Sequence, residues 1–256
     1  DGSVTSIGNR AFKNCSSLKI ITIPDSTALN IINKRKNASI KEGDLFDADK
    51  LNAEREQIAR ILRNQGYFNF QKELLSFYVD SALNSKQVDA EISIQPQFLN
   101  NDSALQIIFT KKTFDKITII ALKDNDDINN PNIQLDTIFY NNYTVIYNPN
   151  NKAFRPNAII NQIKITPGRF YSDYSVENTY SRLNSLNAVK YVNIYFNEKE
   201  DNKLDANITI TQNKPHTVSL ELEGTYSGGD LGAGATIGYK NNNIFHGSEI
   251  LNVNIN

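Results

Sequence analysis

The sequence is poor in the residues that most often carry protein chemistry. Its 256 residues include no methionine, no tryptophan, two histidines and a single cysteine, Cys15. One cysteine cannot form an internal disulfide, so a small disulfide-stapled secreted domain is excluded. Cys15 itself falls at an interior position of a repeat-like segment, where a buried and unreactive thiol is expected.

The chain also lacks a strong charge and long hydrophobic runs. Lysine and arginine number 27 against 28 acidic residues, which gives a net charge of −1. Such a chain has no overall basic field to attract nucleic acid or an anionic membrane surface, so both are disfavoured as partners. No run of about 18 apolar residues occurs, so no membrane-spanning helix is expected.

Catalytic and metal-binding patterns are missing too. His216 and His246 are isolated and read as polar residues at strand ends. The acidic run of Asp44, Asp47 and Asp49 fits the start of a helix better than a metal site. Asp124, Asp126 and Asp127 lack the glycine and glutamate spacing of a calcium loop. With no Ser-His-Asp, metal or nucleotide motif present, we expect no enzyme, no cofactor and no metal site.

The N-terminal residues 1–27 have the spacing of one solenoid coil. The inward positions would be Ile7, Ala11, Phe12, Cys15 and Leu18, followed by a short strand at residues 21–23. This segment resembles one repeat of the BspA-type leucine-rich-repeat family. A solenoid needs about three coils to bury a core, and the pattern does not recur after Ser26.

Two longer segments repeat each other at a constant offset of 125 residues (168 − 43 = 125). Gly43 and Gly168 each precede an aromatic residue, a helix-capping side chain and an amphipathic helix. The caps are Asp47 and Ser172, whose oxygens can accept from the first free amides of a helix. Gly66 is suited to end the first helix in a left-handed conformation.

Alternating runs follow each helix and predict hairpins. The first pair lies at residues 75–80 and 88–95 and the second at residues 192–196 and 204–210, with turns at residues 84–85 and 199–202. A leading strand at residues 113–122 precedes the second helix, and residues 18–23 or 28–33 would supply the first. We therefore predict modules at residues 28–97 and 104–214, the second with a partly irregular insertion at residues 124–157 rich in Asn, Asp and Pro.

The last stretch, residues 215–256, alternates strictly over three strands of about ten residues. Val218, Leu220 and Leu222 share one face, and the following strand places Ile237 and Tyr239 on one face against glycine and polar residues. Such strands suit a tilted membrane crossing with apolar residues toward lipid. A soluble antiparallel sheet with one wet face gives the same alternation, so periodicity alone leaves both interpretations open.

Specific motifs favour the membrane interpretation. Residues 43–51 (GDLFDADKL) and 62–68 (LRNQGYF) resemble a POTRA module of the BamA/TamA family of outer-membrane assembly proteins, especially TamA-like members of Bacteroidetes. Residues 168–183 resemble the POTRA module next to the barrel, and residues 223–232 and 243–249 resemble its first strands. The resemblance implies an α+β fold: tandem POTRA-like β-α-β-β modules followed by the first antiparallel strands of a truncated outer-membrane β-barrel. Both ends of the sequence look cut, which indicates a fragment.

The resemblance also implies a function without chemistry. POTRA modules of this family hang in the periplasm and receive unfolded outer-membrane proteins or a TamB-like partner by β-augmentation, while the barrel contacts outer-membrane lipid. The first barrel strand would form one side of a seam into the membrane. Its candidate residues are Thr217, Val218, Ser219, Leu220, Glu221, Leu222 and Glu223.

Two further expectations remain from the sequence. The alternative to an assembly factor is a surface adhesin or binding protein built on the leucine-rich-repeat coil. In addition, an incomplete barrel leaves open sheet edges that lipid cannot satisfy, so this fragment alone is not expected to insert stably into a bilayer.

Overall fold

The computed structural model describes residues 18–35, 38–40, 47–82, 87–99, 101–123, 130, 133–140 and 142–256. The chain divides into two compact units. Unit 1 contains residues 1–112 with 170–173, and unit 2 contains residues 113–169 with 174–256. No described helix has the length and hydropathy needed to cross a membrane.

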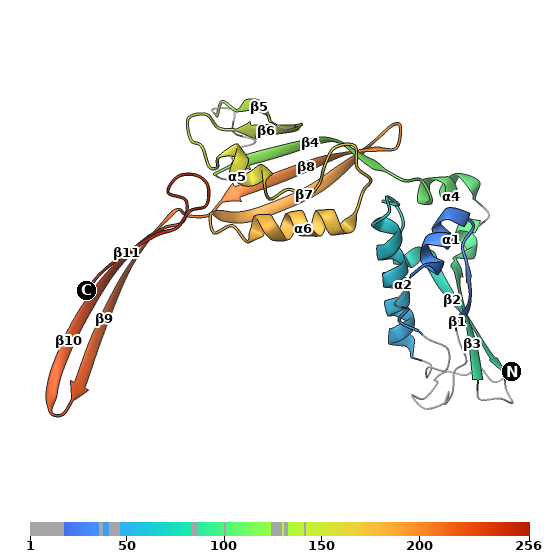
Figure 1. The fold of residues 1–256 in the computed structure, drawn as a ribbon, viewed down its shortest axis with the longest axis horizontal. Coiled ribbons are helices and arrows are strands. Elements are labelled where there is room, and N and C mark those ends of the chain that lie inside the picture. The colour runs from blue at the N-terminus through green and yellow to red at the C-terminus, as the bar shows by residue number, and fades with distance from the viewer. Residues whose placement is uncertain are drawn as a thin grey trace. The chain divides into compact units, whose positions relative to one another are not determined.

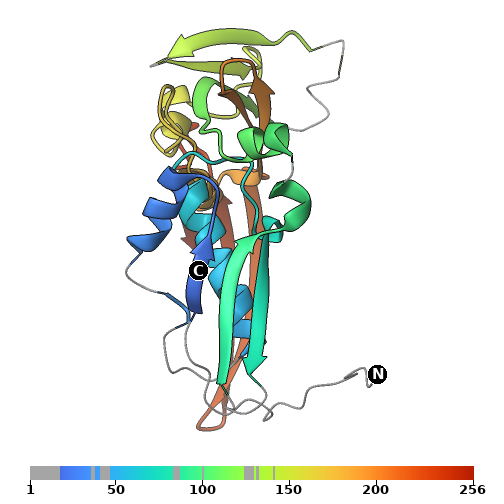
Figure 2. The same ribbon diagram turned by 90° about the vertical axis from the view of Figure 1, so that its right-hand side faces the viewer.

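Unit 1 is a three-stranded sheet with helices packed against it. Its elements are β1 (Leu18–Thr22), α1 (Ser26–Asn33), α2 (Ala48–Arg63), the 3-10 turn η1 (Lys72–Leu74), β2 (Leu75–Ala82), β3 (Gln87–Ile94), α3 (Pro96–Leu99) and α4 (Asp102–Ile108). The strand order is β1-β3-β2, with β1 parallel to β3 and β2 antiparallel to it. In Figure 2 the blue strand β1 lies beside the teal and green hairpin of β2 and β3.

The leading strand of unit 1 comes from the segment that resembles a solenoid coil. Leu18–Thr22 pairs with β3, and Ile21 lies opposite Ile92. This was one of the two leading strands that the sequence allowed. The predicted boundary between residues 27 and 28 falls inside α1, which begins at Ser26. The other coil positions, including Cys15, lie outside the described residues.

Helix α2 forms as its sequence predicts. The Asp47 carboxylate accepts from the amides of Asp49 at 2.9 Å and Lys50 at 3.4 Å, so it caps the helix start. Past the other end, Gly66 has a φ of 104°, in the left-handed region. The buried face of the helix carries Ile58 and Leu62, each 0% exposed, into the core of unit 1.

One buried carboxylate interrupts this apolar face. Glu54 is 0% exposed and its Oε1 lies 2.7 Å from Nη2 of Arg35, whose side chain is 10% exposed. The other oxygen accepts from the Ser39 amide at 2.6 Å. The ion pair thus fixes the irregular segment after α1 against α2.

Unit 2 contains two sheets. The first has the order β5-β6-β4-β8-β7 and is built from β4 (Thr113–Leu122), β5 (Asp136–Tyr140), β6 (Tyr143–Tyr147), β7 (Val189–Lys199) and β8 (Lys203–Gln212). Helices α5 (Pro156–Ile160) and α6 (Asp173–Asn184) accompany it (Figure 1). Strand β4 runs parallel to β8, and β7 is antiparallel to β8, so these three strands repeat the topology of unit 1.

The insertion at residues 124–157 is more regular than its composition predicted. It contains the antiparallel hairpin of β5 and β6, and β6 pairs in parallel with β4 from Ile117↔Tyr143 to Ala121↔Tyr147. The insertion therefore adds two strands to the sheet and moves its outer edge from β4 to β5.

The second sheet of unit 2 has the order β11-β10-β9, with β9 (His216–Ser227), β10 (Asp230–Asn241) and β11 (Leu251–Ile255) all antiparallel. Its register aligns the alternating faces. Leu220, Ile237 and Ile255 form one row, because Ile237 lies opposite both of the others. The predicted apolar face is thus continuous across the three strands.

The opposite face of this sheet is close-packed at Gly238. A Cβ added there would lie 2.5 Å from Ser219 Oγ and 3.1 Å from Asn254 Oδ1. Replacing Gly238 with valine is expected to displace the Ser219 hydroxyl and to weaken the pairing of β10 by about 1 kcal/mol, at the low end of overpacking, because the nearest atom is the end of a small side chain that can rotate. Hydrogen exchange of the β10 amides, followed by mass spectrometry, measures the effect.

The matched control is Gly234→Val in the same strand and on the same face, where an added Cβ meets nothing within 4 Å. Its β10 amides should exchange as in the unsubstituted protein. Equal acceleration in both variants would show that β-sheet glycines in general, and not the packing at Gly238, set the stability of the strand.

Candidate functional site

The candidate seam residues lie at an outer edge. They belong to β9, which pairs with β10 along its whole length, while no described strand pairs with its other side. Val218, Leu220 and Leu222 are 72%, 65% and 76% exposed. The strand therefore offers both unpaired backbone groups and an apolar face, which are the properties a membrane seam requires. Its role as a seam stays a prediction.

Two further edge strands occupy equivalent positions in the sheet of unit 1 and in the five-stranded sheet of unit 2. In unit 1 the outer strand is β2, and in unit 2 it is β7, the 11-residue strand Val189–Lys199. Strand β7 carries Tyr191 and Tyr195 on one face, 46% and 44% exposed. An edge strand of this length, with large side chains beside open amides and carbonyls, can accept another strand.

The remaining edge of the five-stranded sheet is β5. Here Phe139 is 82% exposed. Strand β6 covers the side of β4 that would otherwise be open. Strand addition to this sheet is therefore possible at β7 and β5 but is blocked at β4.

A docked loop, residues 242–250, joins β10 to β11 and packs on the five-stranded part of unit 2 (Figure 1). Its anchor is Asn243, 4% exposed. The side-chain Nδ2 donates to the carbonyl of Ala153 at 2.7 Å, and Oδ1 accepts from the amide of Ser248 at 2.9 Å. The Asn243 side chain thus bonds one part of the loop to another and also bonds the loop to the segment before α5.

Other contacts of the docked loop surround this anchor. The amide of Arg155 donates to the carbonyl of His246 at 2.6 Å, and the Ser248 hydroxyl accepts from the amide of Ala188 at 3.0 Å. The guanidinium of Arg155 lies 6.0 Å from the ring centre of Phe245. Backbone amides, first that of Glu249 itself, hold the pKa of the Glu249 carboxyl below its ordinary value, and Arg155 at 3.9 Å adds to this effect.

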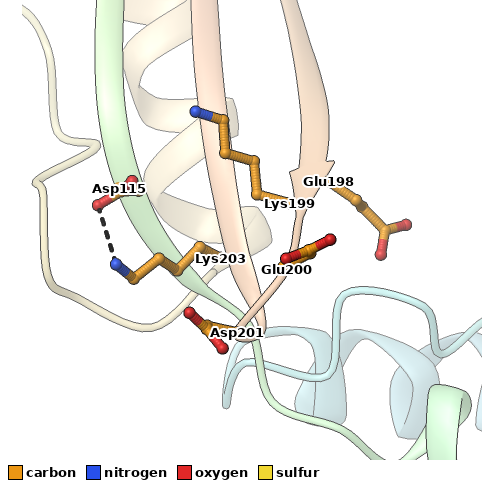
Figure 3. Close-up of a pocket in the computed structure, with 6 residues that line it drawn as sticks. All are labelled: Asp115, Glu198, Lys199, Glu200, Asp201 and Lys203. Carbon is orange, nitrogen blue, oxygen red and sulfur yellow. Dashed lines mark ion pairs between the residues drawn. The ribbon is translucent and has the colours of Figure 1, made fainter.

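A charged hollow lies at the turn between β7 and β8 (Figure 3). It measures about 460 Å³ and is lined by Asp115, Glu198, Lys199, Glu200, Asp201 and Lys203. Lys203 faces Asp115 at 3.7 Å, while Lys199 pairs with Asp205 at 2.8 Å. In Figure 3 the carboxylates of Glu198 and Asp201 point in different directions, so no common centre for a cation is formed.

The two histidines stand apart. Nδ1 of His216 lies 2.8 Å from the hydroxyl of Tyr239, and the two rings are stacked. His246 has a φ of 63° and contributes its backbone carbonyl to the docked loop. Among the described residues no group of three or more His, Cys, Asp or Glu side chains could hold a metal ion.

Comparison with known proteins finds one matching family model and several similar folds. The POTRA family, described as "Surface antigen variable number repeat", matches residues 22–97. No curated protein matches the sequence. Among solved structures, BamA from Haemophilus ducreyi lacking POTRA domains 1–3 is similar with a TM-score of 0.62 at 15% identity, covering 94% of this chain and 36% of that one.

Two other solved structures are less similar. CdiB from Acinetobacter baumannii has a TM-score of 0.41 at 12% identity, covering 94% of this chain and 38% of that one. POTRA1–3 of the periplasmic domain of Omp85 from Anabaena has a TM-score of 0.31 at 11% identity, covering 78% and 67%. At these scores neither adds to the argument.

The chain thus contains a POTRA module at residues 22–97 and has the α+β fold predicted from its sequence, with strands that match the barrel part of a BamA structure. It spans about a third of the length of that structure. The POTRA match begins inside the range assigned to the leucine-rich-repeat coil. That coil and the TamA-like subtype remain predictions.

Several features of the site were not predicted from the sequence. The hairpin of β5 and β6 is one of them. Its aromatic and β-branched residues, and Asn142 in the left-handed region, are typical of a hairpin, but the many Asn, Asp and Pro residues around it favoured an irregular segment. The anchoring role of Asn243 had no signal, because an asparagine in an Asn-rich turn is ordinary in composition.

Proposed function

We propose that this chain is part of an outer-membrane assembly or translocation factor of the Omp85 family, with its POTRA modules in the periplasm. The POTRA match at residues 22–97 and the BamA-like fold support this class. The exposed apolar face of β9, β10 and β11 supports contact with outer-membrane lipid. The work of such a protein is binding and guidance, and we propose no catalytic step, cofactor or metal.

The observation that carries the proposal is the open edge at β7. An unfolded outer-membrane protein is rich in alternating strand-forming segments, and such a segment can satisfy the unpaired amides and carbonyls of an edge strand. Tyr191 and Tyr195 would then lie beside the added strand and contribute apolar contacts and hydroxyl hydrogen bonds. The same reasoning applies to β2 in unit 1, where Tyr78 is 48% exposed.

A TamA-like role is the finer form of this proposal. In that case the strand received by the POTRA edges would come from a TamB-like periplasmic protein, and β9 would form one side of the seam through which a client enters the membrane. Capture of a TamB-like protein by the full chain, in competition with an unfolded outer-membrane protein, would support the finer form. Capture of the client alone would support only the general one.

The test uses a photocrosslinking amino acid at the β7 edge. Tyr195→p-benzoylphenylalanine is mixed with an unfolded outer-membrane barrel protein kept soluble by a periplasmic chaperone. We expect strong crosslinks to the client, suppressed by an excess of a synthetic strand peptide, because Tyr195 lies beside the predicted docking position. Crosslinked species are identified by mass spectrometry.

Tyr180→p-benzoylphenylalanine is the matched control. Tyr180 is 49% exposed, close to the 44% of Tyr195, but it lies on helix α6 and not on an edge strand. Crosslinking several times stronger at position 195 supports strand addition. Equal yields at both positions, or none at either, would count against the proposed function.

A further inference from the structure

A second hollow of unit 2 lies at the opposite end of the five-stranded sheet from the charged hollow. It measures about 320 Å³, near the lower end of the roughly 300–1,000 Å³ of small-ligand sites. The C-terminal end of β4, the start of β7 and the end of β8 converge there. The lining residues are Lys123, Lys190, Gln212, Asn213, Lys214 and Pro215.

The charge of this lysine hollow is of one sign. Three of its described lining residues are lysines, and none of the described ones is acidic. Within the described part of the chain, Lys123, Lys190 and Lys214 form no ion pair, whereas Lys199 and Lys203 at the other end of the sheet each face an aspartate. A net charge of −1 for the whole chain therefore conceals a local group of three lysines, which attracts an anion.

Gln212 gives the lysine hollow a second polar function. The residue is 7% exposed, and its side-chain oxygen receives no hydrogen bond from any described residue. Buried amide oxygens are almost always paired, so the unpaired oxygen of Gln212 can accept from a ligand in the hollow when the side chain turns toward it. A hydroxyl or ammonium group attached to the bound anion would meet this need.

The place of the lysine hollow along the chain indicates the source of such an anion. Val218, the first exposed apolar residue of β9, lies only four positions after Lys214 (218 − 214 = 4), which is at most about 14 Å of extended chain. Between them the ring of His216 stacks on Tyr239, an aromatic residue typical of membrane interfaces. When the apolar face of β9 lies in the hydrocarbon layer, the lysine hollow therefore lies at the depth of the headgroups.

We propose that the lysine hollow binds the phosphate of a phospholipid headgroup in the periplasmic leaflet. The three lysines hold the phosphate oxygens, and the Gln212 side chain accepts a hydrogen bond from the headgroup alcohol or ammonium. The choice of a lipid over free phosphate rests on the membrane placement in the proposed function. Strand capture at β7 does not depend on it.

The experiment measures vesicle binding by the full chain. Flotation is compared for vesicles of phosphatidylcholine alone and of phosphatidylcholine mixed with phosphatidylglycerol. The variant Lys123→Gln/Lys190→Gln/Lys214→Gln should lose the preference for phosphatidylglycerol by at least about tenfold, because each lysine near an anionic surface contributes a factor of about five. The wild-type preference should fall with added salt.

The control variant Lys116→Gln/Lys199→Gln/Lys203→Gln removes the same charge at the other end of the sheet and should keep the preference. Circular dichroism shows that both variants fold. An equal loss in both variants, or none in the first, would overturn the proposal. Suppression of vesicle binding by millimolar inorganic phosphate at constant ionic strength would instead assign the lysine hollow to free phosphate. Because crosslinking at Tyr195 is measured without lipid, failure here leaves the test of strand capture unaffected.

Discussion

Replacing Arg35 with methionine is expected to destabilise unit 1 by about 3–5 kcal/mol. The variant leaves the Glu54 carboxylate, 0% exposed, without its cation at 2.7 Å. A buried charge that loses its partner keeps the full cost of desolvation, whereas methionine replaces only the packing of the arginine side chain. The Ser39 amide still donates to Glu54, but one hydrogen bond cannot offset the lost ion pair.

Because the chain divides into two compact units and has no tryptophan, the measurement follows the amides of α2 directly. Hydrogen exchange of its amides in increasing urea gives the free energy of opening of unit 1. The double variant Arg35→Met/Glu54→Leu should recover most of the loss, since an apolar pair of similar volume can replace a buried ion pair at little cost.

The exposed pair of Lys72 and Glu56 provides the control. Their side chains are 37% and 53% exposed, and an ion pair in such surroundings contributes little to stability because water and salt screen it. Lys72→Met should therefore change the opening of α2 far less than Arg35→Met. If the two variants have equal effects, or if the double variant is no better than Arg35→Met, the buried pair is not what holds this segment.

The contrast between Asp47 and Glu54 shows which parts of unit 1 are readable in the sequence. Asp47 and Gly66 act on backbone groups a few residues away, so local chemistry predicts the ends of α2. Glu54 is paired with a residue 19 positions earlier in an irregular segment (54 − 35 = 19). Only the fold brings the two side chains together. From the sequence of the helix alone, Glu54 would be assigned to the exposed face with the other charged residues.

The strand β1 illustrates a different limit. A short run of alternating isoleucines is compatible both with the strand of a solenoid coil and with the leading strand of a POTRA sheet, because each of these strands buries one face. Leu18–Thr22 is therefore compatible with the leucine-rich-repeat resemblance and lies nonetheless in the sheet with β3. Periodicity fixes the face that is buried but not the partner that buries it.

The strands β9, β10 and β11 were predictable in register as well as in position. Strict alternation makes a slip of one residue costly, since it would turn every apolar side chain to the polar face. The observed rows, such as Leu220, Ile237 and Ile255, keep the predicted faces. What the alternation could not reveal is how this sheet is held to the rest of unit 2, which depends on the docked loop.

Replacing Asn243 with alanine is expected to release the docked loop, weakening its attachment by about 1–3 kcal/mol. The change leaves the carbonyl of Ala153, a residue 1% exposed, and the amide of Ser248 without their partners at 2.7 and 2.9 Å. A buried backbone group left unpaired costs about 1–3 kcal/mol, and this applies to the Ala153 carbonyl, whereas the part-buried Ser248 amide can reach water and adds less. Amides of residues 242–250 should then exchange at least about fivefold faster, since every 1.4 kcal/mol is a factor of ten.

Asn252→Ala is the control, because Asn252 is exposed on β11 and the substitution removes the same atoms. It should leave the exchange of the docked loop unchanged.

The variant Asn243→Asp separates the two hydrogen bonds of Asn243. Its carboxylate still accepts from the amide of Ser248 but repels the carbonyl of Ala153. A loss of protection close to that in Asn243→Ala would identify the bond to Ala153 as the main attachment. Because the docked loop is the connection between β10 and β11, its release would free the sheet of β9, β10 and β11 from the five-stranded sheet while leaving both sheets folded. Unchanged exchange of the loop in Asn243→Ala would mean that the contacts of Arg155 and Ala188 are sufficient to hold it.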